Sequence, residues 1–350
     1  MPYCRKCGAK LDEDARFCRV CGTPVAAVTV PATPQRRRPF LLPVAILIAI
    51  LLTAVVVSAL VFLPFYSVYF NQTNQVANEA GVNSLNLDFQ ADVANVNIFF
   101  KNLSGKMIIL NVTASGWTGI LSDPNRTVAV TFDQKTVNNT VTVTSRVSRV
   151  ETWPLSYNLN VVCDVYIDPS ANLNVTVRSG VGQIVMNADK AATFQALNLE
   201  TTTGNVEASL AQGVVIAGNV SAKTTTGSVT FNWEQADTMG NVSVNLKSTT
   251  GSVNLYVTRN SRLSGNVFID AGTTTGSVNL AMAIHNDVGA QIESRKVLGG
   301  ISVEQGGFSG NQSLLQSSNY PAGSNFLVSL ATTTGGIHIN AYYDSSVVRS

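Results

Sequence analysis

The chain is poor in the residues on which enzymes most often depend for proton transfer. Only two of its 350 residues are histidine, His285 and His338, and Asp, Glu, Lys and Arg together make up 13% of the chain. The sequence has no glycine-rich phosphate loop, nucleophile elbow or His-Glu metalloprotease motif. We therefore predict that the protein is not an enzyme. His338 alternates with Ile337 and Ile339, so we expect it to be a surface residue of a strand.

The scarcity of charge accompanies an abundance of Thr, Ser, Asn, Val and Gly, which is typical of β-structure with polar, uncharged surfaces. The net charge of +2 is unevenly distributed. Residues 1–39 have eight basic and three acidic residues (8 − 3 = +5), and the remainder has fifteen and eighteen (15 − 18 = −3). A basic head and a mildly acidic body indicate two environments, and no nucleic-acid partner is expected.

Cysteine is confined almost entirely to the first 21 residues. The pattern is Cys4-x2-Cys7-x10-Cys18-x2-Cys21. Two residues between paired cysteines let both thiolates bind one ion, and Gly8 and Gly22 follow where the turn needs a positive φ. Four thiolates suit Zn²⁺ in a closed structural site, and metal binding would supply most of the folding energy of so short a segment. Iron in a rubredoxin-like site and two disulfides are the alternatives.

The knuckles "YCRKCG" and "FCRVCG" resemble those of small zinc-ribbon domains at the N-termini of many prokaryotic membrane proteins. The resemblance covers residues 3–25, and we take residues 1–25 as this domain. It implies protein contact and not catalysis, so a cytosolic protein partner of the ribbon is expected.

One long apolar run, "FLLPVAILIAILLTAVVVSALVFL" at 40–63, contains no charge. About 20 apolar residues span a bilayer, and this run follows three arginines at 36–38 and precedes an aromatic cluster. We predict a transmembrane helix over 40–66, joined to the ribbon by a Pro/Arg linker at 26–39. The lipid bilayer is then a partner. The protein is predicted to lie in the cell membrane as a single-pass protein, with its N-terminus in the cytosol and its C-terminal domain extracellular. A cleaved signal peptide is the alternative.

One short phrase, Thr-Thr-Thr-Gly or Ser-Thr-Thr-Gly, occurs five times. Its glycines are Gly204, Gly227, Gly251, Gly276 and Gly335, and weaker copies place Gly182 and Gly299 in the series. The first four are 23, 24 and 25 residues apart. Each repeat holds two alternating strands, one before the phrase and one after its glycine. The period predicts an all-β fold whose ectodomain is a parallel β-solenoid (β-helix) with coils of about 23 residues over 181–345, stacked in chain order, with a loop inserted at 305–324.

The phrase is interpreted as the corner of each coil. Threonine fits an extended backbone, neighbouring hydroxyls can bond between coils, and glycine lets the chain turn. Solenoids that cleave polysaccharides need a row of acidic groups in one groove. Here Glu200, Lys223, Lys247 and Gly272 fall at equivalent places, so no such row is expected.

Residues 71–180 lack the phrase but keep the alternation, and we predict that they form the β-rich first part of the ectodomain. The run "VYIDPSANLNVTVRSGVGQIVM" and the later Gly-[Ser/Asn]-Val strands resemble the putative-adhesin family of bacteria and archaea, which has β-solenoid-like repeats. The resemblance, over roughly 80–345, implies a cell-surface β-domain with an adhesive role.

Several other residues are candidates for modification or packing. Cys163, in "LNVVCDVYI", is expected to be a small buried strand residue. The tryptophans at 117, 153 and 233 are expected to pack in the core or at its rim. The sequons taken as glycosylation candidates are Asn71, Asn102, Asn111, Asn125, Asn138, Asn174 and Asn311, whereas Asn219 and Asn241 are poorer acceptors in Gly-Asn corners.

These features together favour an adhesion or envelope-scaffolding protein that binds a surface ligand. Two alternatives remain open: a regulator or sensor whose ribbon contacts a cytosolic partner, and a scaffold that self-associates through uncapped strand edges.

Overall fold

The computed structural model describes residues 2–25, 41–62, 66–118, 127–150, 157–285 and 287–344. Contacts divide the chain into two compact units, Met1–Val57 and Ser58–Ser350. We refer to the strands of the second unit as the β-body. The predicted linker at 26–39 lies outside the described residues.

The apolar run forms the helix α1 (Leu41–Phe62). In the part of the chain that the structure describes, however, no helix is long and apolar enough to cross a membrane. This finding overturns the predicted transmembrane helix at 40–66. It also overturns the single-pass membrane location with a cytosolic N-terminus and an extracellular C-terminal domain.

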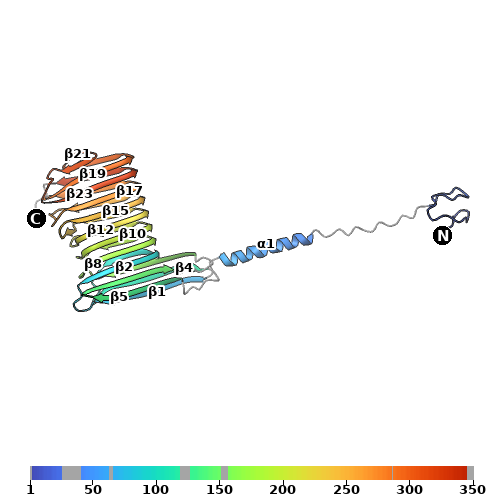
Figure 1. Cartoon of the computed structure of the whole chain (residues 1–350), viewed down its shortest axis with the longest axis horizontal. Coiled ribbons are helices and arrows are strands. Elements are labelled where there is room, and N and C mark those ends of the chain that lie inside the picture. The colour runs from blue at the N-terminus through green and yellow to red at the C-terminus, as the bar shows by residue number, and fades with distance from the viewer. Residues whose placement is uncertain are drawn as a thin grey trace. The chain divides into compact units, whose positions relative to one another are not determined.

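Two large sheets make up the β-body (Figure 1). The first sheet has 11 strands, which are, in spatial order, β1 (Tyr66–Ala77), β4 (Lys106–Thr118), β7 (Tyr157–Ile167), β3 (Asn95–Phe100), β9 (Ile184–Ala188), β11 (Val206–Leu210), β13 (Val229–Glu234), β16 (Val253–Arg259), β18 (Val278–His285), β24 (Ile337–Asp344) and β20 (Ile301–Gly306).

The second sheet has 13 strands. Its order is β21 (Phe308–Asn311), β22 (Leu314–Ser317), β19 (Val288–Leu298), β23 (Ser324–Thr334), β17 (Val267–Thr275), β15 (Val242–Thr250), β12 (Val215–Thr226), β10 (Thr193–Thr203), β8 (Asn172–Val181), β2 (Ser84–Val93), β6 (Thr140–Arg149) and β5 (Val128–Val137), with β14 (Asp237–Thr238) beside β12.

The fold class is therefore all-β with two large mixed sheets, and the prediction of a parallel β-solenoid is wrong as a fold class. The physical reason lies at the ends of the sheets. The strands β1 and β4 pair antiparallel, as do β5 with β6 and β21 with β22. At one such end Asn138 and Asn139 take positive φ angles of 48° and 62°, and this turn reverses the chain between β5 and β6.

The register of the repeated phrase is confirmed in the central strands, which pair in parallel. Thr224 lies opposite Thr201 on one side and Ser248 on the other. Glu200, Lys223, Lys247 and Gly272 are also successive register partners, as the sequence spacing predicts. Equivalent residues of successive repeats therefore stand on adjacent strands.

The expected chain order of the repeats is wrong near the C-terminal end. The strand β23 lies between β17 and β19, and β24 lies between β18 and β20. Gly335 therefore stacks on Gly276, and Gly299 stacks on Gly335. The segment predicted as a loop at 305–324 contains the hairpin β21–β22, which pairs antiparallel with β19. After this hairpin the chain forms β23, which pairs in parallel with β17.

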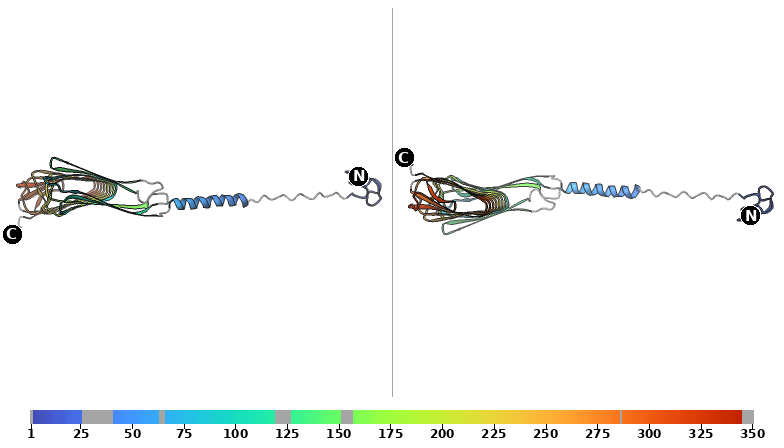
Figure 2. Two further views of the ribbon diagram at one scale, coloured as in Figure 1. Left: turned by 90° about the horizontal axis from the view of Figure 1, so that it is seen from below. Right: turned by 90° about the horizontal axis from the view of Figure 1, so that it is seen from above.

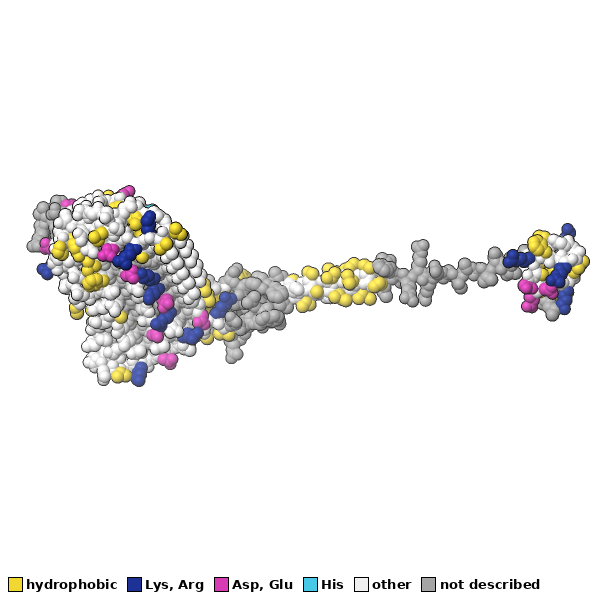
Figure 3. Space-filling view, turned by 45° about the horizontal axis from the view of Figure 1, so that its top comes forward, with side chains coloured by type: hydrophobic (Ala, Val, Ile, Leu, Met, Phe, Trp, Pro, Cys, Tyr) yellow, Lys and Arg dark blue, Asp and Glu magenta, His cyan; other side chains and the backbone are white. Residues whose placement is uncertain are grey.

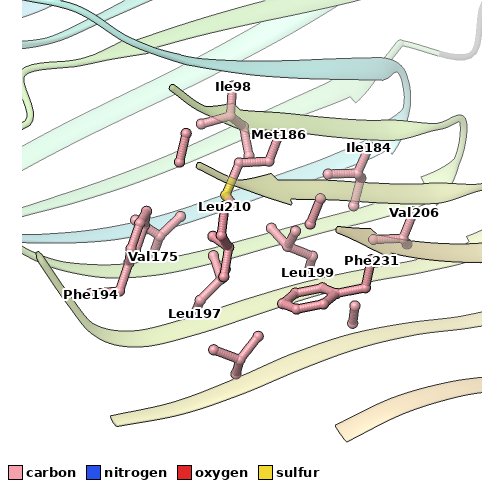
Figure 4. Close-up of a cluster of buried hydrophobic side chains, with 14 of the residues drawn as sticks. Ile98, Val175, Ile184, Met186, Phe194, Leu197, Leu199, Val206, Leu210 and Phe231 are labelled. Atoms are coloured by element: carbon pink, nitrogen blue, oxygen red, sulfur yellow. The ribbon is translucent and has the colours of Figure 1, made fainter. Parts of the chain in front are cut away.

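A single hydrophobic core lies between the sheets, which face one another in the end-on views of Figure 2. The alternation within each repeat directs one side chain in two toward this core (Figure 4), as for Leu199, Val206 and Phe231. Trp233 is fully buried and donates its Nε1 hydrogen to the carbonyl of Ala236 at 2.9 Å.

The buried position predicted for Cys163 on β7 is confirmed. Ile301 and Val303 are only half-buried because β20 ends its sheet.

Candidate metal centre and cationic groove

The four N-terminal cysteines converge through two similar knuckles. In the first, the amide of Gly8 donates to the carbonyl of Cys4 at 2.8 Å, and in the second the amide of Gly22 donates to the carbonyl of Cys18 at 2.8 Å. Both glycines have positive φ angles, 71° and 66°, as predicted. Each knuckle thus presents two thiols on the inner side of one turn.

The thiols fit a tetrahedral metal. All four Sγ atoms lie within 4.8 Å of one another, and the Sγ atoms of Cys4 and Cys21 and of Cys7 and Cys18 are 3.5 Å apart. Zinc–sulfur bonds of about 2.3 Å require sulfurs about 3.8 Å apart, which agrees with this arrangement. The residues therefore suit structural Zn²⁺, with Cys4, Cys7, Cys18 and Cys21 as its ligands.

Local hydrogen bonds favour the thiolate form that a metal requires at Cys4 and Cys21. At Cys7 the Ala9 backbone lowers the pKa, but hydrogen bonds with the Cys21 and Cys18 thiols outweigh it and raise the pKa to about 12. The Thr23 hydroxyl, 3.2 Å from Cys21 Sγ, together with the Thr23 amide, lowers the pKa of Cys21 to about 6. Backbone hydrogen bonds from Lys6 and Cys7 lower the pKa of Cys4.

Each Thr-Thr-Thr-Gly corner of the β-body is held against one carbonyl of the neighbouring corner. The hydroxyl of Thr201 donates to Gly182 O at 2.9 Å. A Cβ built on Gly204 would lie 2.1 Å from the same oxygen, so only glycine fits. The equivalent hydroxyl bonds are Thr224 to Gly204 at 2.8 Å, Ser248 to Gly227 at 2.8 Å, Thr273 to Gly251 at 2.8 Å and Thr332 to Gly276 at 3.0 Å. The expected bonds between hydroxyls are replaced by bonds from hydroxyl to carbonyl.

A groove of about 570 Å³ crosses the strands beside these corners, from β10 to β19. Lys223, Lys247, Arg295 and Lys296 line it, together with Glu200. Figure 3 shows basic and acidic side chains gathered in a column over the β-body. The remaining lining comes from the corner threonines and Ser248, and from Val297, Gly272 and Ala331.

Side-chain size changes abruptly within one register row of the groove. Lys247 lies opposite Gly272, Gly272 opposite Ala331, and Ala331 opposite Arg295. Two neighbouring strands therefore present almost no side chain between two cations. The sequence spacing predicts the first part of this row, but Arg295 and Ala331 join it only through the altered strand order.

Two cations of the groove form ion pairs with carboxylates that belong to the adjacent register row. Lys247 Nζ lies 2.6 Å from Asp270, and an Arg295 nitrogen lies 3.1 Å from Glu293. Asp270 and Glu293 line a separate pocket of about 350 Å³. Among the described residues, no carboxylate oxygen lies within 4.0 Å of Lys223 Nζ.

The other predicted site residues are dispersed. His338 is exposed, which confirms its expected position on a strand surface, and its Nδ1 lies 2.7 Å from the Ser302 hydroxyl. Trp233 is in the core, Trp117 is 49% exposed, and Trp153 lies outside the described residues. The glycosylation candidates Asn71, Asn102, Asn138, Asn174 and Asn311 are exposed, Asn111 is half-buried and Asn125 lies outside the described residues.

Glycosylation stays a prediction at all of these asparagines. Asn174 already donates its Nδ2 hydrogen to Asn86 Oδ1 at 2.9 Å, a bond that a glycan on that nitrogen would disturb.

Comparison with known proteins identifies the N-terminal domain. Residues 3–25 match the family model of the zinc-ribbon domain. No curated protein sequence matches the chain.

The solved structures that are similar to the chain include three bacterial proteins. A "putative cell adhesion protein" from Clostridium sporogenes is 14% identical with a TM-score of 0.39, and the match covers 78% of this chain and 99% of that one. A "putative adhesin" from Bacteroides fragilis is 13% identical with a TM-score of 0.35, covering 78% and 96%. Another from Parabacteroides distasonis is 10% identical with a TM-score of 0.29, covering 79% and 96%.

Proposed function

We propose that the protein is a non-enzymatic binding protein with an adhesion or envelope-scaffolding role, in which the β-body holds the surface ligand. The observation that supports this most directly is the register of the second sheet. Equivalent polar residues, such as Thr225, Thr249 and Thr274, are exposed on successive strands near the corner. One face of the sheet therefore presents the same hydrogen-bonding group, a threonine hydroxyl, on one strand after another.

Such a face suits a ligand that is itself repetitive. Adjacent strands are about 4.8 Å apart, so each repeat adds a hydroxyl at a regular step. Each exposed hydroxyl contributes little alone, but several contacts made by one ligand act together through a high effective concentration. An envelope polymer has the repetition that this surface can use.

The test is a co-sedimentation assay of the purified full chain with insoluble envelope fractions from bacterial and archaeal cells. We expect saturable binding that an excess of unlabelled protein displaces. A Cys18→Ser variant, which lacks one zinc ligand, provides the control and should bind equally well, because the β-body is a separate compact unit. Absence of saturable binding to every fraction would sink the proposal.

A second candidate function, contact between the ribbon and a protein partner, is supported by exposed apolar side chains. Tyr3, Phe17 and Val20 are 63%, 61% and 76% exposed on a very small domain. A Phe17→Ser/Val20→Ser variant should keep its zinc but lose partners that the full chain retains on a column of cell extract. If the variant and the original chain retain the same proteins, this face is not a binding surface.

A further inference from the structure

We infer that the groove, which runs across the strands from β10 to β19, binds an acidic polysaccharide. This inference rests on the proposed function, since it assigns a ligand class to the same β-body. Three observations carry it: the charge of the lining, the absence of long side chains at the two positions between Lys247 and Arg295, and the row of hydroxyls alongside.

Charge favours an acidic ligand. The groove lining contains four cations and one carboxylate. With Asp270 and Glu293, which pair with two of these cations from an adjacent row, the balance is 4 − 3 = +1. Lys223 has no carboxylate within 4.0 Å among the described residues, and its side chain is half-buried beside Lys247. Two lysines on adjacent strands repel one another, and an anion placed between them relieves that repulsion.

The floor at Gly272 and Ala331 has no long side chain of its own, and Gly272 is buried. A Cβ built on Gly272 would lie 3.2 Å from Lys247 Nζ, which shows that this lysine extends over the glycine. Arg295 stands on the far side of Ala331 and is 77% exposed. A ligand lying on this floor would therefore meet a cation at either end.

The hydroxyls distinguish a carbohydrate from other polyanions. Thr225, Thr249, Thr274 and Thr333 line the groove on four strands and are exposed. Threonine hydroxyls both donate and accept hydrogen bonds, as sugar hydroxyls do. No aromatic side chain lines the groove among the described residues, so it lacks the stacking surfaces that single-stranded nucleic acids use.

The dimensions suit a polymer and not a single sugar. The groove extends over six strands, β10, β12, β15, β17, β23 and β19, which corresponds to about 24 Å at 4.8 Å per step. Its threonines repeat at that step, so a chain along the groove meets similar partners with each unit.

The experiment measures binding of the full chain to three immobilised polymers at low and high salt. Polygalacturonate supplies carboxylates and hydroxyls, dextran supplies hydroxyls alone, and polyphosphate supplies charge with few hydroxyls. We expect polygalacturonate to bind most tightly and its binding to weaken as salt rises. Dextran or polyphosphate binding as tightly as polygalacturonate would overturn the inference.

Variants locate the site. Lys223→Gln/Lys247→Gln should weaken polygalacturonate binding about tenfold at low salt, since two charge contacts with the ligand are lost. Ala331→Gln adds a long neutral side chain between Gly272 and Arg295. It should weaken polygalacturonate binding without changing the charge of the groove. The matched control, Lys135→Gln/Lys190→Gln, removes two exposed lysines outside the groove lining and should leave binding unchanged. Equal losses in the control and the groove variants would show a non-specific charge effect and overturn the inference.

The envelope assay separates this inference from the proposed function. If groove variants keep full envelope binding and polygalacturonate is not bound, the groove assignment fails while the binding function stands. If polygalacturonate binding is lost in the groove variants, the inference stands whatever the envelope fractions show. Failure of both assays overturns both.

Discussion

Thr224 and Gly227 meet at one atom, the carbonyl oxygen of Gly204. The Thr224 hydroxyl donates to this oxygen at 2.8 Å, and a Cβ on Gly227 would lie 2.0 Å from it. The last residue of the repeated phrase thus lets the backbone of the preceding corner come close, and the first residue donates a hydrogen bond to the carbonyl group of that corner. This relationship leads to the first two predictions.

Thr224→Val should lower the free energy of unfolding by about 1–3 kcal/mol, because valine keeps the shape but leaves the Gly204 carbonyl without its donor. Denaturant unfolding of the full chain measures the loss. Thr224→Ser should retain most of the stability, since Ser248 makes the same bond at the next corner. The exposed Thr225→Val is the control and should change stability by less than about 0.5 kcal/mol. Equal effects of Thr224→Val and Thr225→Val would contradict the account.

Gly251→Ala should destabilise the β-body by more than about 3 kcal/mol or prevent its folding. Its Cβ would lie 1.9 Å from Gly227 O at a φ of 138°. Gly300→Ala is a close control in the corner region, because a Cβ there has no atom within 4 Å. Soluble yield and the thermal unfolding midpoint should separate the two variants clearly. A Gly251→Ala protein with the stability of Gly300→Ala would show that the corner can relax.

Removing zinc should unfold the ribbon and leave the β-body intact. The ribbon has only a small buried cluster, Cys4, Leu11 and Cys18, so its folding depends on the metal. After treatment with a chelator, amide exchange in residues 2–25 should become fast, while exchange in the β-body and its melting temperature stay the same. Retained protection of the ribbon without metal would show that zinc is not its structural support.

Cys163 should react with a thiol reagent only when the β-body unfolds. Burial, with a smaller effect of the Asp164 charge, raises the pKa of Cys163 to about 12. In chelator, the folded chain should therefore expose four of its five thiols, and denaturant should release the fifth. Reaction of five thiols without denaturant would be the contrary result.

The raised pKa of Cys163 makes the stability of the β-body depend on pH. Below pH 9 the Cys163 thiol is neutral in both states and contributes nothing to the pH dependence of stability. Between about pH 9 and 12 the unfolded thiol ionises and the folded one does not. Stability should fall as pH rises through this range, by at most about 1.4 kcal/mol per pH unit. Cys163→Ala should show a correspondingly smaller slope, and identical slopes would contradict the shift.

The sequence predicts the register of the β-body because glycine spacing reports it directly. Gly204, Gly227 and Gly251 recur at nearly equal steps, and each needs the space that a Cβ would fill. The four zinc ligands were equally predictable, because two residues between paired cysteines are enough to bring both thiols of each knuckle to one metal ion.

The order of the outer repeats could not be predicted in the same way. Gly299 follows Gly276 by 23 residues, the ordinary step, yet its neighbour is Gly335. Spacing along the chain shows which residues are equivalent but not which strands are adjacent. Arg295 therefore could not be assigned to the row of Lys223 and Lys247. The antiparallel ends were missed because single hairpins leave no period in the sequence.

The insertion of β23–β24 affects how the molecule is made. During translation, β19–β20 emerges from the ribosome before the strands that will separate it from β17–β18. At that moment β19–β20 has the same spacing as every earlier repeat, so the nascent chain can pair it in the wrong place with good register. Completion of the native stack then requires this early pairing to open. We therefore expect the regularity that makes the body easy to extend to create a kinetic trap as well, with release from it as the slow step of folding.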